Sequence, residues 1–485
     1  MKSERSGISL TVVALALAAA LVQASALGAD DAAAWQAQHD QLVARLRALQ
    51  DRAGDFGAAY QPVYRAALDW YEQWGGNPRH AVDDWMVPPE KYATDLADAL
   101  EHGRNYFAEN PGALWPLCFE AKFPGGKTVR ANYWLALPTG FPTAGRSFPL
   151  VIGLHGSGWL GHKLSFVPKA RKDAAGGRAF TVTPIDEQGP WQIDFLNAYL
   201  DELLRILPID ADRVYVEGHS LGGMATWEWA ADNPERLAGI SPRSARGEPF
   251  RAARLQNVPA WVIHGENDDV ISTGFADQMV TAMQAAGGRV KYSILAGVPH
   301  NMPDDLDENL VVDWYLQQTR SHAPPPPDPL ARLGINADGF SPWEIISQAE
   351  ASYWSTEPIP AADQDALRHA ALTLFQKTHG AHETVTAPLV EKLDRPTGRI
   401  ALWLQVPRTL RTGFKPDASA TTRPAAKYLR FYFRGTTAAA LAHLPQITAE
   451  AEKAGHHLSE EIWVTTLTLW PGTPTTVAEY RITLK

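Results

Sequence analysis

A serine between two glycines is the first feature of this chain that could do chemistry. The segment Gly218-His219-Ser220-Leu221-Gly222 follows a strand-like apolar run and precedes a run of helix formers. Its spacing fits G-x-S-x-G, in which a sharp strand-to-helix turn exposes a nucleophilic serine and leaves no room for flanking side chains. The spacing predicts Ser220 as a nucleophile, with the Leu221 N–H at a helix N-terminus ready to bind an oxyanion. A chance glycine turn is the alternative that these five residues leave open.

Candidate partners for this serine follow it in the chain. Asp268 and Asp269 come directly after the apolar run "WVIHG", and His300 lies on a loop between a strand-like and a helical segment. The order serine, aspartate, histidine is typical of hydrolases with such a turn. It predicts a triad in which His300 takes the proton of Ser220 and one of the two aspartates holds the imidazole in the required tautomer.

A second oxyanion donor is expected upstream. The apolar run "LVIGL" ends in His155-Gly156-Ser157-Gly158, a loop type that contributes a main-chain N–H to the oxyanion hole. Ser157 is the candidate donor, with Gly158 next. His155 is expected to orient the loop by hydrogen bonding and not to be the general base, because it precedes the nucleophile in chain order. Trp159 and Trp191 are candidates to line the substrate pocket, although packing beside the loop is an equally good interpretation.

The elements that must position these residues alternate between strand and helix. Strand-like and helical runs follow one another from residue 116 to residue 320, which predicts βαβ units and a mainly parallel α/β sheet. Residues 29–115 have helical spacing and form a predicted helical N-terminal region. Residues 321–329 contain four consecutive prolines and are predicted to be a semi-rigid linker. Residues 330–485 are predicted to form a smaller α+β domain with antiparallel pairing.

The first 28 residues are typical of a secretory signal peptide. Lys2 and Arg5 precede an apolar run from Ile8 to Val22, and small residues follow it. A membrane anchor is the alternative, but the run is short for a span of ~20 residues. We therefore expect a periplasmic or secreted protein with no membrane association after cleavage.

Composition and residue types argue against several other functions. A net charge of −10 does not favour nucleic acid or an anionic membrane as partner. Cys118 is the only cysteine, so an intrachain disulfide is excluded, and its apolar neighbours favour a buried role. The histidine pairs His379/His382 and His456/His457 lack companions at metal-binding spacing, and no phosphate-binding or dinucleotide glycine pattern occurs. We expect neither a metal nor a cofactor.

The segments "LPIDADRVYVEGHSLGG", "VPAWVIHGENDDVI" and "GGRVKYSILAGVPHN" resemble the branch of the α/β-hydrolases that contains polyhydroxybutyrate depolymerases, feruloyl esterases and predicted secreted peptidases. The resemblance covers residues 117–318. It implies the α/β-hydrolase fold and, because the aspartate of H-G-x-x-D is the triad acid in that branch, the triad Ser220, Asp268 and His300. Methionine often follows the nucleophile there, whereas this chain has Leu221.

The last domain is faintly similar to gyrase-inhibitor-like effector-binding modules, which bind small molecules in an aromatic-lined cleft. Five aromatic residues could form such a cleft here: Trp403, Tyr428, Phe431, Trp463 and Trp470. Alternating aromatic residues on a strand are also typical of one face of a core.

Taken together, these residues predict a secreted serine hydrolase that cleaves carboxylic esters, with a small-molecule or polymer ester as substrate. A serine peptidase of the same fold is the alternative within enzymes. A non-catalytic protein that binds a small molecule through its C-terminal domain is the alternative from another class.

Overall fold

A computed structural model describes residues 29–75, 89–110, 113–122, 126, 128–143, 145–156, 177–184, 191–302, 307–363, 366–367, 369–374, 389–406, 420–469 and 475–485. It forms two compact units. The first contains the described residues within Met1–Phe148, Gly158–Gly189 and Asn197–Ile209, and the second contains those within Pro149–Ser157, Pro190–Leu196 and Asp210–Lys485. The predicted signal peptide lies outside the described residues.

Helices dominate the start of the first unit, as expected. Their apolar faces pack on aromatic side chains, and Tyr92 stacks on Trp115 with 5.5 Å between ring centroids. The helical elements are α2 (Ala29–Leu49), η1 (Gln50–Phe56), α3 (Gln61–Trp70), η2 (Tyr71–Gly75), α4 (Pro89–Glu101) and α5 (Tyr106–Glu109). Strand β2 (Thr128–Ala136) then pairs antiparallel with both β1 (Leu114–Lys122) and β4 (Phe180–Pro184).

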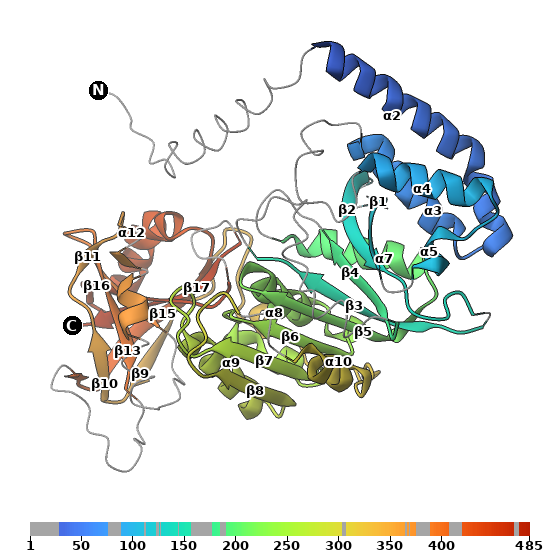
Figure 1. Ribbon diagram of the computed structural model, residues 1–485. Helices are drawn as coiled ribbons and strands as arrows, with labels where there is room; N and C mark the ends of the chain where they lie inside the picture. The colour runs from blue at the N-terminus through green and yellow to red at the C-terminus, as the bar shows by residue number, and fades with distance from the viewer. Residues whose placement is uncertain are drawn as a thin grey trace. The chain divides into compact units, whose positions relative to one another are not determined.

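The second unit contains the strands that position the candidate site. Neighbouring strands follow the order β3 (Phe148–Leu154), β5 (Ile209–His219), β6 (Gly239–Arg243), β7 (Ala260–Gly265) and β8 (Val290–Leu295), side by side in Figure 1. Strands β5 to β8 pair in parallel. Their carboxyl ends therefore share one edge, which is where ligands bind in open α/β sheets.

Helices follow these strands. They are α7 (Ile193–Ile206), α8 (Leu221–Asp232), η4 (Pro234–Arg236), η5 (Pro249–Leu255), α9 (Thr273–Ala285) and α10 (Glu308–Leu316). Helix α8 packs on β6, and α9 packs on β7 and β8. Strands β3, β6 and β7 are buried along their whole length, and this burial explains why β3 and β7 are almost continuously apolar in sequence.

The predicted linker leads through η6 (Pro329–Arg332) to a second sheet of nine strands. Its strands are β9 (Glu344–Gln348), β10 (Ala351–Ser355), β11 (Ile359–Pro360), β12 (Val390–Asp394), β13 (Arg399–Gln405), β14 (Thr421–Arg423), β15 (Ala426–Arg434), β16 (Leu458–Thr466) and β17 (Val477–Leu484). Every described pairing in this sheet is antiparallel. Helix α12 (Thr437–Lys453) buries Leu444 and Ile447 against one face.

The expected fold class is confirmed: a mainly parallel α/β sheet is accompanied by an N-terminal helical region and a smaller α+β part. Within the described residues, no helix has the length and apolar character needed to span a membrane.

Candidate active site

Ser220 sits on a strained turn between β5 and α8. Its φ of 54° and ψ of −118° are unusual for a residue with a side chain. Its N–H donates to the carbonyl of Arg243 at 3.0 Å, and the helical hydrogen bonds of α8 begin with Met224 N–H to Ser220 C=O at 2.9 Å. The Leu221 N–H therefore lies ahead of the helical hydrogen bonds, at the positive end of the helix dipole.

Glycines are required on both sides of this turn because the backbones approach closely. A Cβ on Gly222 would lie 2.6 Å from the His155 carbonyl oxygen, and one on Gly218 would lie 2.8 Å from the Gly223 nitrogen. Real Cβ atoms do not come this close to backbone atoms. The two glycines of the G-x-S-x-G pattern are thus required because the turn leaves no space for a side chain at either position.

Three side chains from three strand ends meet beside this turn. His300 Nε2 lies 2.9 Å from Ser220 Oγ, and His300 Nδ1 lies 2.8 Å from Asp268 Oδ2. All three residues are buried. The structure therefore brings together the serine, aspartate and histidine that the sequence singles out, in the order that proton transfer requires.

The local backbone selects between the two adjacent aspartates. Asp268 Oδ1 accepts the N–H groups of Val270 at 2.9 Å and Ile271 at 2.7 Å, whereas Asp269 is exposed. Burial alone would raise the pKa of Asp268, but hydrogen bonds from His264, His300 and the Ile271 N–H outweigh it and hold that pKa well below its usual value. Asp268 is therefore a carboxylate at neutral pH, and His300 carries its proton on Nδ1.

His264 supports the aspartate and was not singled out by the sequence analysis. Its Nε2 lies 3.2 Å from Asp268 Oδ2 and donates to the Ile271 carbonyl at 2.7 Å. Since both neighbours of Nε2 are acceptors, this nitrogen carries the proton. The signal is present in the sequence as a histidine four residues before the acid, but its role depends on how the loop folds back.

His219 supports the histidine loop in the same way. Its Nε2 donates to the main-chain carbonyl of His300 at 2.7 Å. Burial lowers the pKa of His219 to about 4, so the ring is neutral at physiological pH. A contact between residues 219 and 300 has no local signal, so sequence analysis could not assign this role.

The candidate oxyanion loop is described as far as Gly156. His155 is buried, which lowers its pKa to about 4, and its Nδ1 lies 2.8 Å from the Gly156 carbonyl. Trp191 is buried and donates from Nε1 to the His155 carbonyl at 3.1 Å. Trp191 therefore holds this loop. Ser157 and Trp159 lie outside the described residues.

The five aromatic residues proposed for a cleft in the last domain do not share one face. Trp403 and Trp463 make an edge contact with centroids 5.0 Å apart, and Arg423 lies over Trp463 and Tyr428 at 3.7 and 4.6 Å. Phe431 instead stacks on Tyr480 in the core beneath α12. Trp470 lies outside the described residues.

Metal ligands do not gather among the described residues: no group of three or more histidine, cysteine, aspartate or glutamate side chains is arranged to hold an ion. His379 and His382 lie outside them.

Comparison with known proteins gives partial matches. No protein-family model matches the chain. An 88-residue segment is 33% identical to a bifunctional acetylxylan esterase/xylanase from Neocallimastix patriciarum, over 18% of this chain and 13% of that protein. A 167-residue segment is 29% identical to the putative esterase NocK of Nocardia uniformis subsp. tsuyamanensis, over 30% of this chain and 48% of that protein. Both relatives are named as esterases. The chain spans less than half the length of either one.

Solved structures also align with part of the chain. A thermostable esterase is 25% identical with a TM-score of 0.37, over 42% of this chain and 63% of its own. An acylaminoacyl peptidase is 14% identical with a TM-score of 0.35, over 44% of this chain and 43% of its own.

Proposed function

We propose that this protein is a serine hydrolase that cleaves carboxylic esters through an acyl-enzyme. The observation that carries the proposal is the position of His300, within hydrogen-bond distance of both Ser220 Oγ and Asp268. The esterase names of the two relatives that share sequence with the chain support it.

The chemistry follows from the protonation states. Ionised Asp268 keeps the proton of neutral His300 on Nδ1, so Nε2 presents a lone pair to the Ser220 hydroxyl. Nε2 takes the hydroxyl proton as Ser220 Oγ bonds to the ester carbonyl carbon, and the imidazolium then protonates the departing alcohol. Water repeats these steps on the acyl-enzyme and releases the acid.

Negative charge on the carbonyl oxygen is stabilised by main-chain donors. The Leu221 N–H is one donor, because it precedes the hydrogen bonds of α8. We assign the second to the Ser157 N–H on the strength of the H-G-x-G pattern. Trp159 remains a proposed wall of the substrate pocket, and Trp191 contributes by holding the loop that leads to Ser157.

We favour ester cleavage over peptide cleavage because hydrolysis of an amide makes greater demands on the active site. An amine is a poor leaving group, and peptidases need extended contacts to hold a peptide backbone in register. The described residues before β1 form a small set of helices. We therefore propose small-molecule or polymer esters as substrates and keep a serine peptidase as the second candidate.

A fluorophosphonate probe and paired substrates test both proposals. The probe should label the wild-type protein and leave Ser220→Ala unlabelled, and kcat/KM should be far higher for p-nitrophenyl or feruloyl esters than for aminoacyl anilides. Labelling of another serine would refute the triad. A preference for anilides would leave the triad intact and replace the esterase by the peptidase. A folded wild-type protein that is neither labelled nor active would favour the non-catalytic binding protein.

We further propose that residues 1–28 direct export and are then removed, which places the enzyme in the periplasm or outside the cell. The mass of the protein recovered from the periplasm or the medium tests this. A small ligand at the aromatic face around Trp403 and Trp463 remains a proposal for the last domain.

A further inference from the structure

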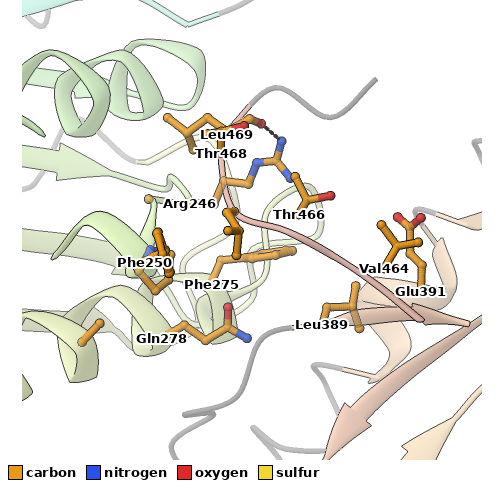
Figure 2. A pocket seen from close by; sticks show the side chains of 14 residues that line it. Arg246, Phe250, Phe275, Gln278, Leu389, Glu391, Val464, Thr466, Thr468 and Leu469 are labelled. Atoms are coloured by element: carbon orange, nitrogen blue, oxygen red, sulfur yellow. Dashed lines mark hydrogen bonds between the residues drawn. The ribbon is translucent and has the colours of Figure 1, made fainter. Parts of the chain in front are cut away.

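A cavity of about 400 Å³ lies apart from the triad in the second unit, between α9 and the second sheet (Figure 2). Its walls come from the segment after β6, from α9, and from the second sheet around β12 and β16. None of the triad residues lines it. Along α9 the wall residues are Phe275, Gln278 and Ala282, so the wall runs from the start of the helix toward its end, away from the sheet edge that carries Ser220.

Arg246 places a positive charge at this cavity. Its Nη2 donates to the Leu469 carbonyl, and no carboxylate among the described residues lies within ion-pair distance of it. Glu248 acts on the Arg246 charge electrostatically, but its carboxylate accepts the Leu469 N–H at 2.9 Å and pairs with Arg251 at 3.0 Å. Burial lowers the pKa of Arg246.

A guanidinium offers five N–H donors, and the Leu469 carbonyl uses only part of that capacity. Charged groups that are removed from water are normally paired, because an unpaired charge costs free energy in a low dielectric. A carboxylate matches the fork geometry of arginine and is the partner that restores this balance. The cavity beside Arg246 therefore favours an organic acid.

The walls next to Arg246 are apolar and partly aromatic. Phe250 and Phe275 come from the hydrolase side, and Leu389 and Val464 come from the second sheet. Phe275 also packs against the apolar cluster around Trp354 and Leu404 in the second sheet, which keeps the two sides together. Such walls suit a flat apolar body, since aromatic rings bury area with few rotatable bonds.

Glu391 adds a second polar group. It pairs in register with Val464, and among the described residues no cation or hydrogen-bond donor reaches its carboxyl group. Burial raises the pKa of Glu391. A carboxyl group in either protonation state can hydrogen-bond a hydroxyl, as acceptor when ionised and as donor when protonated.

We propose that this cavity binds a small hydroxyaryl carboxylic acid, with the carboxylate on Arg246, the ring against Phe250 and Phe275, and the hydroxyl at Glu391. The ligand closes the space between the hydrolase sheet and the second sheet, so its binding stabilises their packing. This gives the last domain a ligand-binding role separate from the aromatic face around Trp403. The proposal does not depend on turnover at Ser220.

Calorimetric titration of the full chain with 3-(4-hydroxyphenyl)propanoate tests the site. The Ser220→Ala protein is used so that chemistry at the triad does not contribute. Saturable binding is expected, and Arg246→Gln should weaken it about 10- to 100-fold, because a hydrogen bond between charged groups is lost. Arg246→Lys should weaken it less, since the charge is kept but the fork is lost. Arg289→Gln, at an exposed arginine outside the cavity, is the matched control and should bind as the parent does.

The role of Glu391 is tested by changing this residue and, separately, by removing the hydroxyl group of the ligand. Glu391→Ala should weaken the hydroxylated acid and leave 3-phenylpropanoate unchanged. Ligand should also raise the Tm of the parent and not that of Arg246→Gln. Absence of saturable binding, or equal binding by the parent, Arg246→Gln and Arg289→Gln, would overturn the proposal. Binding that is lost only when the triad pocket is blocked by fluorophosphonate on the wild-type protein would place the acid in the active site instead.

Discussion

The backbone of Ser220 predicts that this residue, which we propose as the nucleophile, destabilises the protein. With φ at 54° and ψ at −118°, its Cβ is held in a region that costs an L-residue about 1–3 kcal/mol. Glycine has no Cβ and escapes this cost, although it loses about 0.5–1 kcal/mol through the greater freedom of the unfolded chain. Ser220→Gly should therefore be more stable than Ser220→Ala by about 0.5–2 kcal/mol. Both substitutions remove the same hydroxyl, so the difference isolates the strain.

Urea unfolding of the two variants measures this difference directly. Ala285→Gly, at an exposed position in the last turn of α9, is the control for an ordinary helical backbone. There glycine should be the less stable residue by about 0.5–1 kcal/mol. If Ser220→Gly is no more stable than Ser220→Ala while the control behaves as expected, the turn is not strained and the reasoning fails.

Three further predictions concern the surroundings of Ser220. Asp268→Asn should lower kcat by about 10⁴-fold because it favours the wrong imidazole tautomer of His300. Asp269→Asn changes an exposed side chain and should alter kcat little. If kcat falls more in Asp269→Asn than in Asp268→Asn, the proposed triad acid is Asp269 instead. Gly222→Ala should lower the free energy of unfolding by about 1–3 kcal/mol and kcat/KM by about 10²-fold, because the added Cβ would lie 2.6 Å from the His155 carbonyl oxygen. Gly239→Ala is the control, since the nearest atoms to its Cβ lie at 3.6 Å, and it should change neither the unfolding free energy nor kcat/KM. The pKa of His219 is about 4 in the folded protein and 6.5 in the unfolded chain, so the unfolded state binds more protons and the stability of the wild-type protein falls as the pH is lowered from 7 to 4.5. In urea unfolding, His219→Gln should remove about 1–2 kcal/mol of that fall. The same pH dependence in the variant and the wild type would contradict the lowered pKa of His219.

Sequence predicted the parts of the fold that carry a strong local pattern. The apolar strands β3, β5, β7 and β8 and the helices α7 to α10 are visible in the hydrophobic spacing. Strand β6 is not, because "GISPR" is short and contains proline and arginine, and it becomes a strand only through pairing with β5 and β7. Strand β12 is not predicted for a similar reason. Its sequence "VEKLD" is short and contains three charged residues, and it becomes a strand through pairing with β13 and β16.

The candidate site likewise contains residues that the sequence predicts and residues that only the structure reveals. Motif order singles out Ser220, Asp268 and His300 because each follows a strand at one sheet edge. The choice of Asp268 over Asp269 rests in the structure on which carboxylate faces the Val270 and Ile271 N–H groups. The roles of His219 and Trp191 depend on contacts with the carbonyls of His300 and His155, which no local pattern records.

These supporting contacts share a physical feature that bears on how the site keeps its shape. Each loop beside Ser220 is held by a neutral donor to a main-chain carbonyl: His219 to His300, Trp191 to His155, and the Ser220 N–H to Arg243. Neutral bonds of this kind do not depend on a counter-charge, and salt screens them little compared with exposed ion pairs. Because the pKa of His219 is about 4, its donor stays neutral as the pH falls from 7 to 5. The hydrogen bond that holds the loop carrying His300 is therefore retained over that range.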